Sequence, residues 1–535
     1  MGAYVINILL NKWGSETVTG DRKASKPNLV AFKNTVQAVK LLKKHIDNKS
    51  KIAVHCDVDV DGIGSGYILK KFLKSQGANN NIYIINKERE HGVSQKHVDF
   101  FNKHKVDLIV ILDSSSNEIE TIKQFNCDVL VVDHHEINHG DTYIKNENEY
   151  IIVNNMIDNM EVGEIKEWIS SLGNKDSSII EPYKADERMS GGLVLYELLR
   201  VYQYAYDIGP ALENLRLYQW VGITLFSDSI LLANERNQWY IEKSVQSMQV
   251  EGSIKTIIKE LNPYKSKMDK SLINYTLAPI INKAIRAGAS AEALDIVMNR
   301  PAAILSLNKY KEEQEKALGI IRKDIVYREE YIMENMTGRD ISRNYYGVIA
   351  SRICGDYNKN AVVYVVKNGV AEGSFRGRYP GVDYRNVFVD YYKEAYAQGH
   401  KVAFGFKVRE DKLKGIMEKL QDIENVYENR IYLTAGDIDK EYRGINHIDD
   451  IDEFKRQGNL WKMAVGNSKV SSMEQIEIVT SVRNVRMISQ RGKLYMYEAL
   501  GIECKAFEII ESSLVSIYPE YSSEIEVYLR NYKLN

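Results

Sequence analysis

The sequence predicts an α/β protein of several domains, and three observations lead to this prediction. The chain has 535 residues, more than one hydrophobic core usually serves, so two to four domains are expected. Its composition, with 44% hydrophobic and 27% charged residues, is ordinary for a globular protein with substantial cores. Between residues 51 and 155, short apolar runs alternate with helix-like stretches. This alternation is typical of a parallel sheet covered by helices on both faces.

The first domain is expected to contain five strands and several helices. The strands correspond to the runs KIAVH, NIYII, DLIVIL, DVLVV and YIIV, and helices are expected at SGYILKKFLKSQG and VSQKHVDFFNKHK. Residues 190–204 and 212–232 also show helical patterns and would close this domain. In parallel sheets, ligands gather at the carboxyl ends of the strands. The chemistry of the protein is therefore expected at that edge.

The remainder of the chain predicts three further parts. Residues 304–336 are rich in charge but keep apolar residues at helical spacing, which predicts a long connecting helix. A smaller mixed α/β region follows at about 345–420, with strands at AVVYVV, AEGSFRG and VAFGFKV. Alternating runs in the last hundred or so residues suit a small β barrel or sandwich. We expect domains at 1–250, 251–336, 337–430 and 431–535.

Composition also narrows the classes of protein. No apolar stretch approaches the roughly 18 residues of a membrane span, and the start lacks a secretory signal pattern, so a cytoplasmic protein is expected. The four cysteines contain no CxxC pair, which argues against a disulfide framework or a zinc ribbon. The net charge is −2, so any surface that binds nucleic acid must be local.

An unusual group of residues follows the first strand. KIAV runs into the segment HCDVDVDG, in which His55, Asp57 and Asp59 stand on alternate residues. Alternate residues of an extended segment share a face, so these three side chains could converge on one point. Neighbouring carboxylates repel each other unless cations lie between them. Acidic turns are also common without any ion, and this segment alone leaves both interpretations open.

Acidic residues and histidines also end other apolar runs of the first domain. DLIVIL ends at Asp113, DVLVV is followed by Asp133, His134 and His135, and VGITLF is soon followed by Asp228. Several strands that deliver such residues to one edge favour a metal site over a set of helix caps. Carboxylates mixed with imidazoles suit Mn²⁺ or Mg²⁺, and the absence of thiolates makes zinc a poorer fit.

In this order, HCDVDVDG, VILDSSS, VVDHHE and FSDS resemble the four metal-binding motifs of the DHH phosphoesterases. The resemblance implies two divalent ions, Mn²⁺ or Mg²⁺, with Asp113 bridging them. One ion would be held by His55, Asp57 and Asp113, and the other by Asp59, Asp113, His134 and Asp228. His135 would face the scissile phosphate as a hydrogen-bond donor, so that His135 and Asp113 are the implied catalytic residues.

Later segments resemble RecJ within this superfamily. They are MSGGLVLYELL, LAPIINKAIRAG, GVIASR, GSFRG and QGHKVAFGF, and NLWKMAVGNSKV resembles a run of the OB domain. The resemblance implies a DHH domain, a connecting helix, a DHH-associated domain and an OB-like C-terminal region. It also implies substrate binding by Asn282, Arg286, Ser351, Arg352, Ser374, Arg376, Gly399 and His400.

The activity implied by RecJ is 5′→3′ hydrolysis of single-stranded DNA to 5′-mononucleotides by two metal ions, in DNA repair, recombination or replication. The partner would be the 5′ end of single-stranded DNA, with a helicase or a protein that binds single-stranded DNA as further partners and no membrane.

Three departures from RecJ lie in substrate-facing segments. Its GGH is Gln398-Gly399-His400, the histidine before GIVASR is missing, and its IPNR followed by GYG becomes Ile85-Asn86-Lys87 followed by His91-Gly92-Val93. This divergence resembles that of prophage-encoded relatives.

Two alternatives to the nuclease stay open. A smaller DHH phosphodiesterase would act on short oligonucleotides or small nucleotides, but it would not need the OB-like region that suits strand tracking. A RecJ-like replication scaffold without activity would not need intact metal motifs, because gathered carboxylates without a cation only cost stability.

Overall fold

The structure is a computed structural model. In it, the chain divides into two compact units. One unit spans residues 23–314, and the other contains residues 1–22 and 315–535. The described residues are 26–85, 91–157, 162–173, 175–183, 189–227, 235–248, 253–261, 273, 277–298, 300, 303, 306, 309–310, 312, 331–357, 359–377, 383–424, 431–433, 476–481, 485–491, 494–499, 502–506, 510, 514–521 and 525–531.

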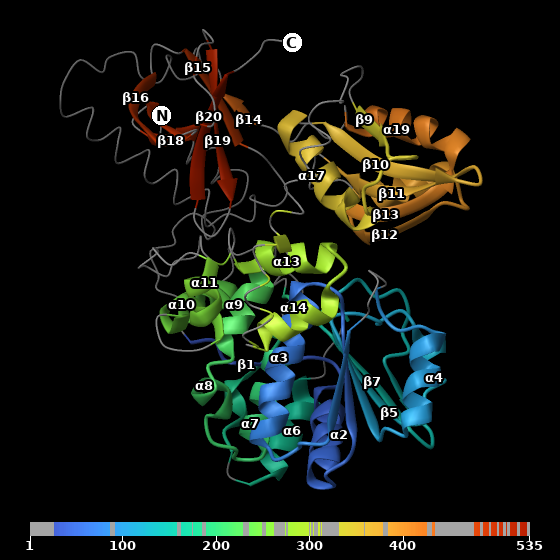
Figure 1. Cartoon of the computed structure of the whole chain (residues 1–535). Helices are drawn as coiled ribbons and strands as arrows, with labels where there is room; N and C mark the ends of the chain where they lie inside the picture. Colours follow the sequence, from blue (N-terminus) through green and yellow to red (C-terminus); the bar gives the residue numbers. More distant parts are fainter. Residues whose placement is uncertain are drawn as a thin grey trace, which may run out of the picture. The chain divides into compact units, whose positions relative to one another are not determined.

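A six-stranded sheet forms the centre of the first unit (Figure 1). Its order is β3-β2-β4-β5-β7-β6, and all neighbours are parallel except the edge strand β6. The strands are β2 (Ile52–Cys56), β3 (Asn81–Ile85), β4 (Leu108–Leu112), β5 (Asp128–Asp133), β6 (Tyr143–Lys145) and β7 (Glu149–Asn154). The five strands predicted from the apolar runs are all present. β2, β4 and β5 are buried along their whole length, as the near-continuous apolar runs require.

Helices cover both faces of this sheet. Phe101 of α4 (Gln95–His104) packs in one core cluster with Ile109, Val131 and Ile152 of the strands. Figure 1 shows α2 (Thr35–Asp47), α3 (Val60–Ser75) and α7 (Gly191–Ala205) together, away from α4. Further helices of this unit are α5 (Ile119–Ile122), α6 (Val162–Ser171), α10 (Glu235–Met248), α11 (Ser253–Leu261), α13 (Ala278–Arg286) and α14 (Ser290–Val297). A short parallel pair joins β1 (Leu29–Ala31) and β8 (Ile180–Pro182). The predicted parallel-sheet domain is confirmed.

The helix predicted at residues 212–232 is wrong as a single element. The chain forms α8 (Ala211–Asn214) and then α9 (Tyr218–Ser227). Arg216, between them, has a left-handed backbone with φ of 53°. A residue in that conformation ends a helix. The apolar pattern that predicted one helix therefore spans two helices and the turn between them.

The second unit contains a five-stranded sheet of order β12-β13-β11-β10-β9. Its strands are β9 (Tyr331–Asn335), β10 (Asn360–Lys367), β11 (Val370–Arg376), β12 (Tyr396–His400) and β13 (Ala403–Arg409). Core residues of α18 (Tyr384–Tyr391) and α19 (Glu410–Glu424) pack with Phe375 and Phe404 of the sheet. Those of α17 (Tyr346–Tyr357) pack with Val363 in a separate cluster. The predicted mixed α/β region is confirmed.

The predicted connecting helix is contradicted at its end. Residues 331–335 form strand β9, which pairs in parallel with β10, although Ile332 fits the helical spacing. Tyr331 and Ile332 are buried, so sheet pairing and burial outweigh the local pattern. Most of residues 304–330 lies outside the described residues.

A seven-stranded sheet occupies the C-terminal region, as the alternating runs predict. Its order is β14-β15-β19-β20-β18-β17-β16, and most neighbours are antiparallel. The strands are β14 (Ile431–Leu433), β15 (Ile476–Ser481), β16 (Val485–Arg491), β17 (Leu494–Ala499), β18 (Ile502–Ala506), β19 (Leu514–Tyr521) and β20 (Ile525–Asn531). The OB-like segment NLWKMAVGNSKV lies outside the described residues. Among the helices that are described, none is both long and apolar enough to span a membrane.

Candidate metal centre

The loops after β2, β4 and β5 bring acidic residues and histidines to the carboxyl edge of the parallel sheet. The backbone N–H of Asp57 donates to the carbonyl of Leu112 at 3.2 Å, and that of Asp113 donates to Val132 at 2.8 Å. Sheet-like pairing thus continues one residue past each strand and holds these residues level with Asp133, the last residue of β5. Asp113 has a φ of 64°, a left-handed conformation that aspartate tolerates better than most residues.

The segment that follows β2 changes from extended chain to helix at Asp59. Asp59 is the N-cap of α3, and its carboxylate accepts the Gly62 N–H at 2.9 Å. A Cβ on Gly62 would lie 2.6 Å from the carbonyl oxygen of Asp57. The turn therefore needs glycine at this position, which explains the last letter of the DxDxDG pattern.

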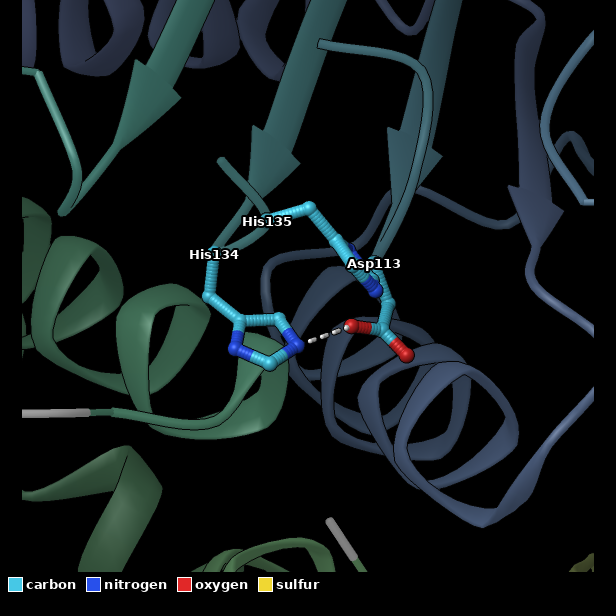
Figure 2. A group of neighbouring side chains, drawn as sticks. All are labelled: Asp113, His134 and His135. Carbon is cyan, nitrogen blue, oxygen red and sulfur yellow. Dashed lines mark ion pairs between the residues drawn. The ribbon is translucent and has the colours of Figure 1, made fainter. Parts of the chain in front are cut away.

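Two groups of possible metal ligands share Asp113. Asp57, Asp59 and Asp113 form one group, and Asp113, His134 and His135 form the other; within each group, one ligand atom per residue lies within 4.8 Å of the others. The His134 Nε2 atom is 3.2 Å from Asp113 Oδ1 (Figure 2). Asp57 and Asp113 are each 1% exposed. Buried carboxylates this close together repel each other unless cations neutralise them, so the donor set fits divalent ions.

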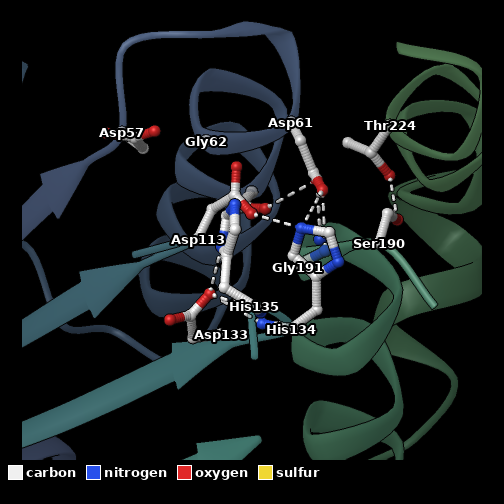
Figure 3. A network of polar contacts seen from close by, with 12 residues as sticks. Asp57, Asp61, Gly62, Asp113, Asp133, His134, His135, Ser190, Gly191 and Thr224 are labelled. Carbon is white, nitrogen blue, oxygen red and sulfur yellow. Dashed lines mark hydrogen bonds and ion pairs between the residues drawn. The ribbon is translucent and has the colours of Figure 1, made fainter. Parts of the chain in front are cut away.

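Asp61 belongs to the same network, although the motif analysis assigned it no role. Its Oδ2 accepts the Gly191 N–H at 2.7 Å and its Oδ1 the Gly192 N–H at 2.8 Å, at the N-terminus of α7 (Figure 3). Asp61 Oδ2 is also 3.8 Å from His134 Nε2. The sequence offered a signal for each side of this contact. One is the third aspartate of HCDVDVDG, and the other is the SGG at the start of the helical pattern of residues 190–204. Their pairing across 130 residues required the fold.

The N-terminus of α7 closes around Asp113. Ser190 caps this helix by accepting the Leu193 N–H at 3.3 Å, and its hydroxyl is 2.9 Å from that of Thr224 on α9. A Cβ added to Gly191 would lie 2.6 Å from Asp113 Oδ1. The position therefore needs glycine so that the carboxylate can approach the helix.

Asp133 orients the two histidines that follow it. Its Oδ1 accepts the backbone N–H groups of His134 and His135 at 2.7 and 3.2 Å, and it lies 2.8 Å from His135 Nδ1. Ser116 N–H donates to the other oxygen at 3.1 Å. Burial raises the pKa of Asp133, but the charge and hydrogen bond of His135 outweigh it and hold the pKa well below its usual range. An ionised carboxylate of this kind fixes the ring orientation of a neighbouring histidine.

Asp57 receives hydrogen bonds from the loop before α4. His91 Nδ1 is 2.7 Å from Asp57 Oδ2, and the Gly92 N–H is 3.4 Å from Oδ1. Burial raises the pKa of Asp57, but the charge of His91 and its hydrogen bond, together with the charge of His135, lower the pKa below its ordinary value. Sequence reasoning noted His91 only as a departure from RecJ.

The remaining implied ligands are placed differently. His55 is buried in β2, and its ring lies edge-on to that of His97 with centroids 4.8 Å apart. Neither of the two ligand groups includes it, and its role as a ligand stays a prediction. Asp228 lies outside the described residues.

Three of the implied substrate-binding residues meet in the second unit. Arg376 Nε donates to Ser351 Oγ at 2.9 Å, and a Cβ on Gly347 would lie 2.7 Å from Arg376 Nη2 and 3.7 Å from Ser374 Oγ. Arg352 follows Ser351 on α17 and is exposed.

The other implied substrate-binding residues lie elsewhere. Gly399 has a φ of 134° in β12, and its carbonyl accepts a hydrogen bond from Arg385 at 2.9 Å. His400 is the last residue of that strand. Asn282 and Arg286 lie one turn apart on α13 of the first unit.

Comparison with known proteins finds one matching family and several similar proteins. Residues 51–208 match the family described as "DHH family, N-terminal domain". The chain is 24% identical over 441 residues to "Putative SPbeta prophage-derived single-strand DNA-specific exonuclease YorK" of Bacillus subtilis (strain 168), covering 73% of this chain and 69% of the relative. It is 18% identical over 522 residues to "Single-stranded-DNA-specific exonuclease RecJ" of the same strain, covering 92% of this chain and 61% of RecJ. A crystal structure of RecJ with Mn²⁺ from Thermus thermophilus has a TM-score of 0.64 and 16% identity, covering 96% of this chain and 74% of that one.

Residues 51–208 therefore match the N-terminal domain of the DHH family. The chain as a whole is similar in sequence to RecJ and shares the fold of the RecJ structure. The resemblance drawn from the ordered motifs is confirmed. One of the similar proteins is named as prophage-derived.

Proposed function

We propose that this protein is an exonuclease that hydrolyses single-stranded DNA from the 5′ end to 5′-mononucleotides with two divalent ions, Mn²⁺ or Mg²⁺. The observation that carries the proposal is the pair of ligand groups that share Asp113. The single-strand DNA-specific exonucleases among its relatives support the substrate class. A role in DNA repair, recombination or replication, with a helicase or a single-strand-binding protein, would follow from this activity.

The first unit supplies the residues for hydrolysis. His55, Asp57 and Asp113 would hold one ion, while Asp113, His134 and Asp228 would hold the other. The resemblance implies Asp59 for the second ion, but Asp59 groups with Asp57 and Asp113, so we propose it as a ligand of the first. Asp61, 3.8 Å from His134 and bonded to the N-terminus of α7, would support the second set from outside. Divalent ions held by these residues would polarise the phosphodiester, lower the pKa of a bound water and stabilise the leaving oxygen.

His135 would donate a hydrogen bond to the scissile phosphate. Asp133 holds its Nδ1 at 2.8 Å, which places the other ring nitrogen on the side away from Asp133. The ionised state of Asp133 favours a proton on Nδ1 and keeps the ring in one orientation. In the doubly protonated ring, in which Nε2 also carries a proton, His135 would be positioned as a donor without a change of rotamer.

The second unit would supply the anchor for the 5′ end. A terminal phosphate carries more charge than an internal diester, and a guanidinium can meet it with charge-assisted hydrogen bonds. Arg376, with Ser351 at 2.9 Å and the neighbouring Ser374, forms a set of donors of this kind. Asn282, Arg286, Arg352, Gly399 and His400 remain proposed contacts along the strand.

The decisive experiment compares 3′-labelled single strands that carry a 5′ phosphate or a 5′ hydroxyl, in Mn²⁺. We expect mononucleotides to leave from the 5′ end, with faster cleavage of the phosphorylated strand, and Arg376→Ala to erase most of that difference. Arg409→Ala is the matched control. Arg376 pairs with Ala403 at one end of β13, and Arg409 lies at the opposite end of that strand. It forms an exposed ion pair with Asp411.

Four outcomes would contradict the proposal. Loss of nucleotides first from the 3′ end, or equal rates on both strands, would exclude 5′ anchoring. Cleavage restricted to dinucleotides and other short substrates would identify a small-nucleotide phosphodiesterase. A wild-type chain that binds no Mn²⁺ and cuts nothing would be a scaffold.

A further inference from the structure

We propose that His91 is a positioning residue of the metal centre, which orients the carboxylate of Asp57 toward the ion that Asp57, Asp59 and Asp113 would hold. The inference rests on the metal-dependent part of the proposed function. Its central observation is the 2.7 Å contact between His91 Nδ1 and Asp57 Oδ2. His91 stands in the segment where the sequence departs from the GYG of RecJ.

The backbone around His91 is held against the loop that carries Asp113. Gly92 has a φ of 72°, and a Cβ there would lie 2.9 Å from Ser115 Oγ. The Val93 N–H donates to the same hydroxyl at 3.0 Å. Ser115, two residues after Asp113, itself has a φ of 75°. The His91 ring is therefore presented to Asp57 by a backbone that is anchored to this loop.

The two partners of the contact differ in their surroundings. The side chain of Asp57 is 1% exposed, whereas that of His91 is 51% exposed. Asp57 lies between the end of β2 and the start of α3, so its carboxylate needs donors to select one rotamer. His91 and the Gly92 N–H, at 3.4 Å from Oδ1, supply one donor to each oxygen. Each oxygen keeps a lone pair for an ion.

His91 acts through Asp57 and is not itself one of the grouped ligands. Among the described residues, the group around Asp57 contains Asp59 and Asp113, and 2.7 Å is the length of a hydrogen bond between an imidazole and a carboxylate. Partners that hydrogen-bond to metal ligands fix the orientation and basicity of those ligands, and their loss typically costs about 10–100-fold in metal affinity. The same effect is expected for His91.

The test measures Mn²⁺ binding to the full chain by the electron paramagnetic resonance signal of free Mn²⁺. His91→Ala should weaken one of the two sites by roughly 10–100-fold and leave the other unchanged. His91→Asn should restore most of the affinity, because its amide N–H₂ can take the place of Nδ1–H. His104→Ala is the matched control, since His104 is an exposed histidine whose Nδ1 contacts the Phe100 carbonyl within its own helix.

The result for His91→Ala can overturn the inference without affecting the nuclease proposal. If His91→Ala binds Mn²⁺ at both sites with wild-type affinity, the positioning role is excluded. If His91→Asn binds Mn²⁺ as weakly as His91→Ala does, the positioning role is also excluded, because the imidazole ring itself would then be a ligand. All three variants should remain folded without metal, so that a change in Mn²⁺ affinity does not reflect loss of the fold. A chain that shows the expected Mn²⁺ pattern but cuts no single-stranded DNA would refute the nuclease alone.

Discussion

Replacement of Gly191 by alanine should separate the metal chemistry from the stability of the fold. Gly191 is the first residue of α7 and has an ordinary helical backbone, so alanine is allowed there. Its new Cβ would lie 2.6 Å from Asp113 Oδ1 and 3.0 Å from the Asp113 Cβ and Cγ. Contacts between carbon and oxygen become ordinary at about 3.4 Å, so the Asp113 carboxylate would have to retreat by about 0.8 Å. Both ligand groups share that carboxylate, and both would be distorted.

The expected loss can be estimated from this displacement. A misplacement of about 1 Å in a catalytic group can cost on the order of 100-fold in rate. Gly191→Ala should therefore reduce cleavage of single-stranded DNA by about 30- to 100-fold and weaken Mn²⁺ binding at both sites. Alanine favours a helix over glycine by at most about 1 kcal/mol. This gain offsets part of the crowding, so the midpoint of thermal unfolding should change little.

Gly192→Ala is the matched control, one residue further along the same helix. Its Cβ would lie 2.6 Å from Thr224 Oγ1 and 2.7 Å from Cγ2, on the side of α9 and not of Asp113. Overpacking of this kind costs typically about 1–3 kcal/mol. Gly192→Ala should unfold at a lower temperature but cut at nearly the wild-type rate where it is folded. Cleavage by Gly191→Ala within about threefold of wild type, or equal losses of activity in both folded variants, would refute the reasoning.

Three further predictions address the site and its support. Asp113→Ala should abolish hydrolysis and weaken both metal sites while the fold stays intact; substantial turnover would exclude the bridging role. Mn²⁺ should support cleavage at lower concentrations than Mg²⁺, because imidazoles soften the site, and Ca²⁺ should fail because its longer bonds misplace the water; equal rates in Ca²⁺ would contradict direct ligation. Asp128, which accepts hydrogen bonds from Lys44, His45 and the Glu149 N–H, should stabilise the fold by about 1–3 kcal/mol at pH 7. Burial raises its pKa, but the bonds from His45 and Lys44 lower it below the ordinary value, so this contribution is present above about pH 4 and is lost as the pH falls through the lowered value. Denaturation of Asp128→Asn and wild type should therefore differ at pH 7 and converge in acid, and a constant difference would contradict the assignment.

The strands and the sheet edge could be predicted because their signals are local. Runs such as LIVIL and DVLVV are too apolar for any place except the middle of a covered sheet, and both are buried throughout β4 and β5. The carboxyl ends of neighbouring parallel strands then lie at one edge, which brings Asp113 and His134 within 3.2 Å. Local spacing failed at β9, where residues with helical periodicity pair with β10. That pairing depends on a strand that begins 25 residues later in the chain.

The role of Asp61 shows where single-sequence reasoning stops at the site itself. Alternation along an extended chain would place Asp57, Asp59 and Asp61 on one face, but Asp59 caps α3 and the helix begins at Val60. From that point, the period changes from two residues to 3.6, so Asp61 leaves the face of the strand. Its carboxylate instead meets two N–H groups of α7 at 2.7 and 2.8 Å, where the positive end of the helix dipole favours an anion. Because Gly191 both donates to Asp61 and leaves room for Asp113, one glycine at the start of a distant helix links the two carboxylates. The sequence pattern could supply each of these residues, but only the packing of α3 against α7 shows that they lie together.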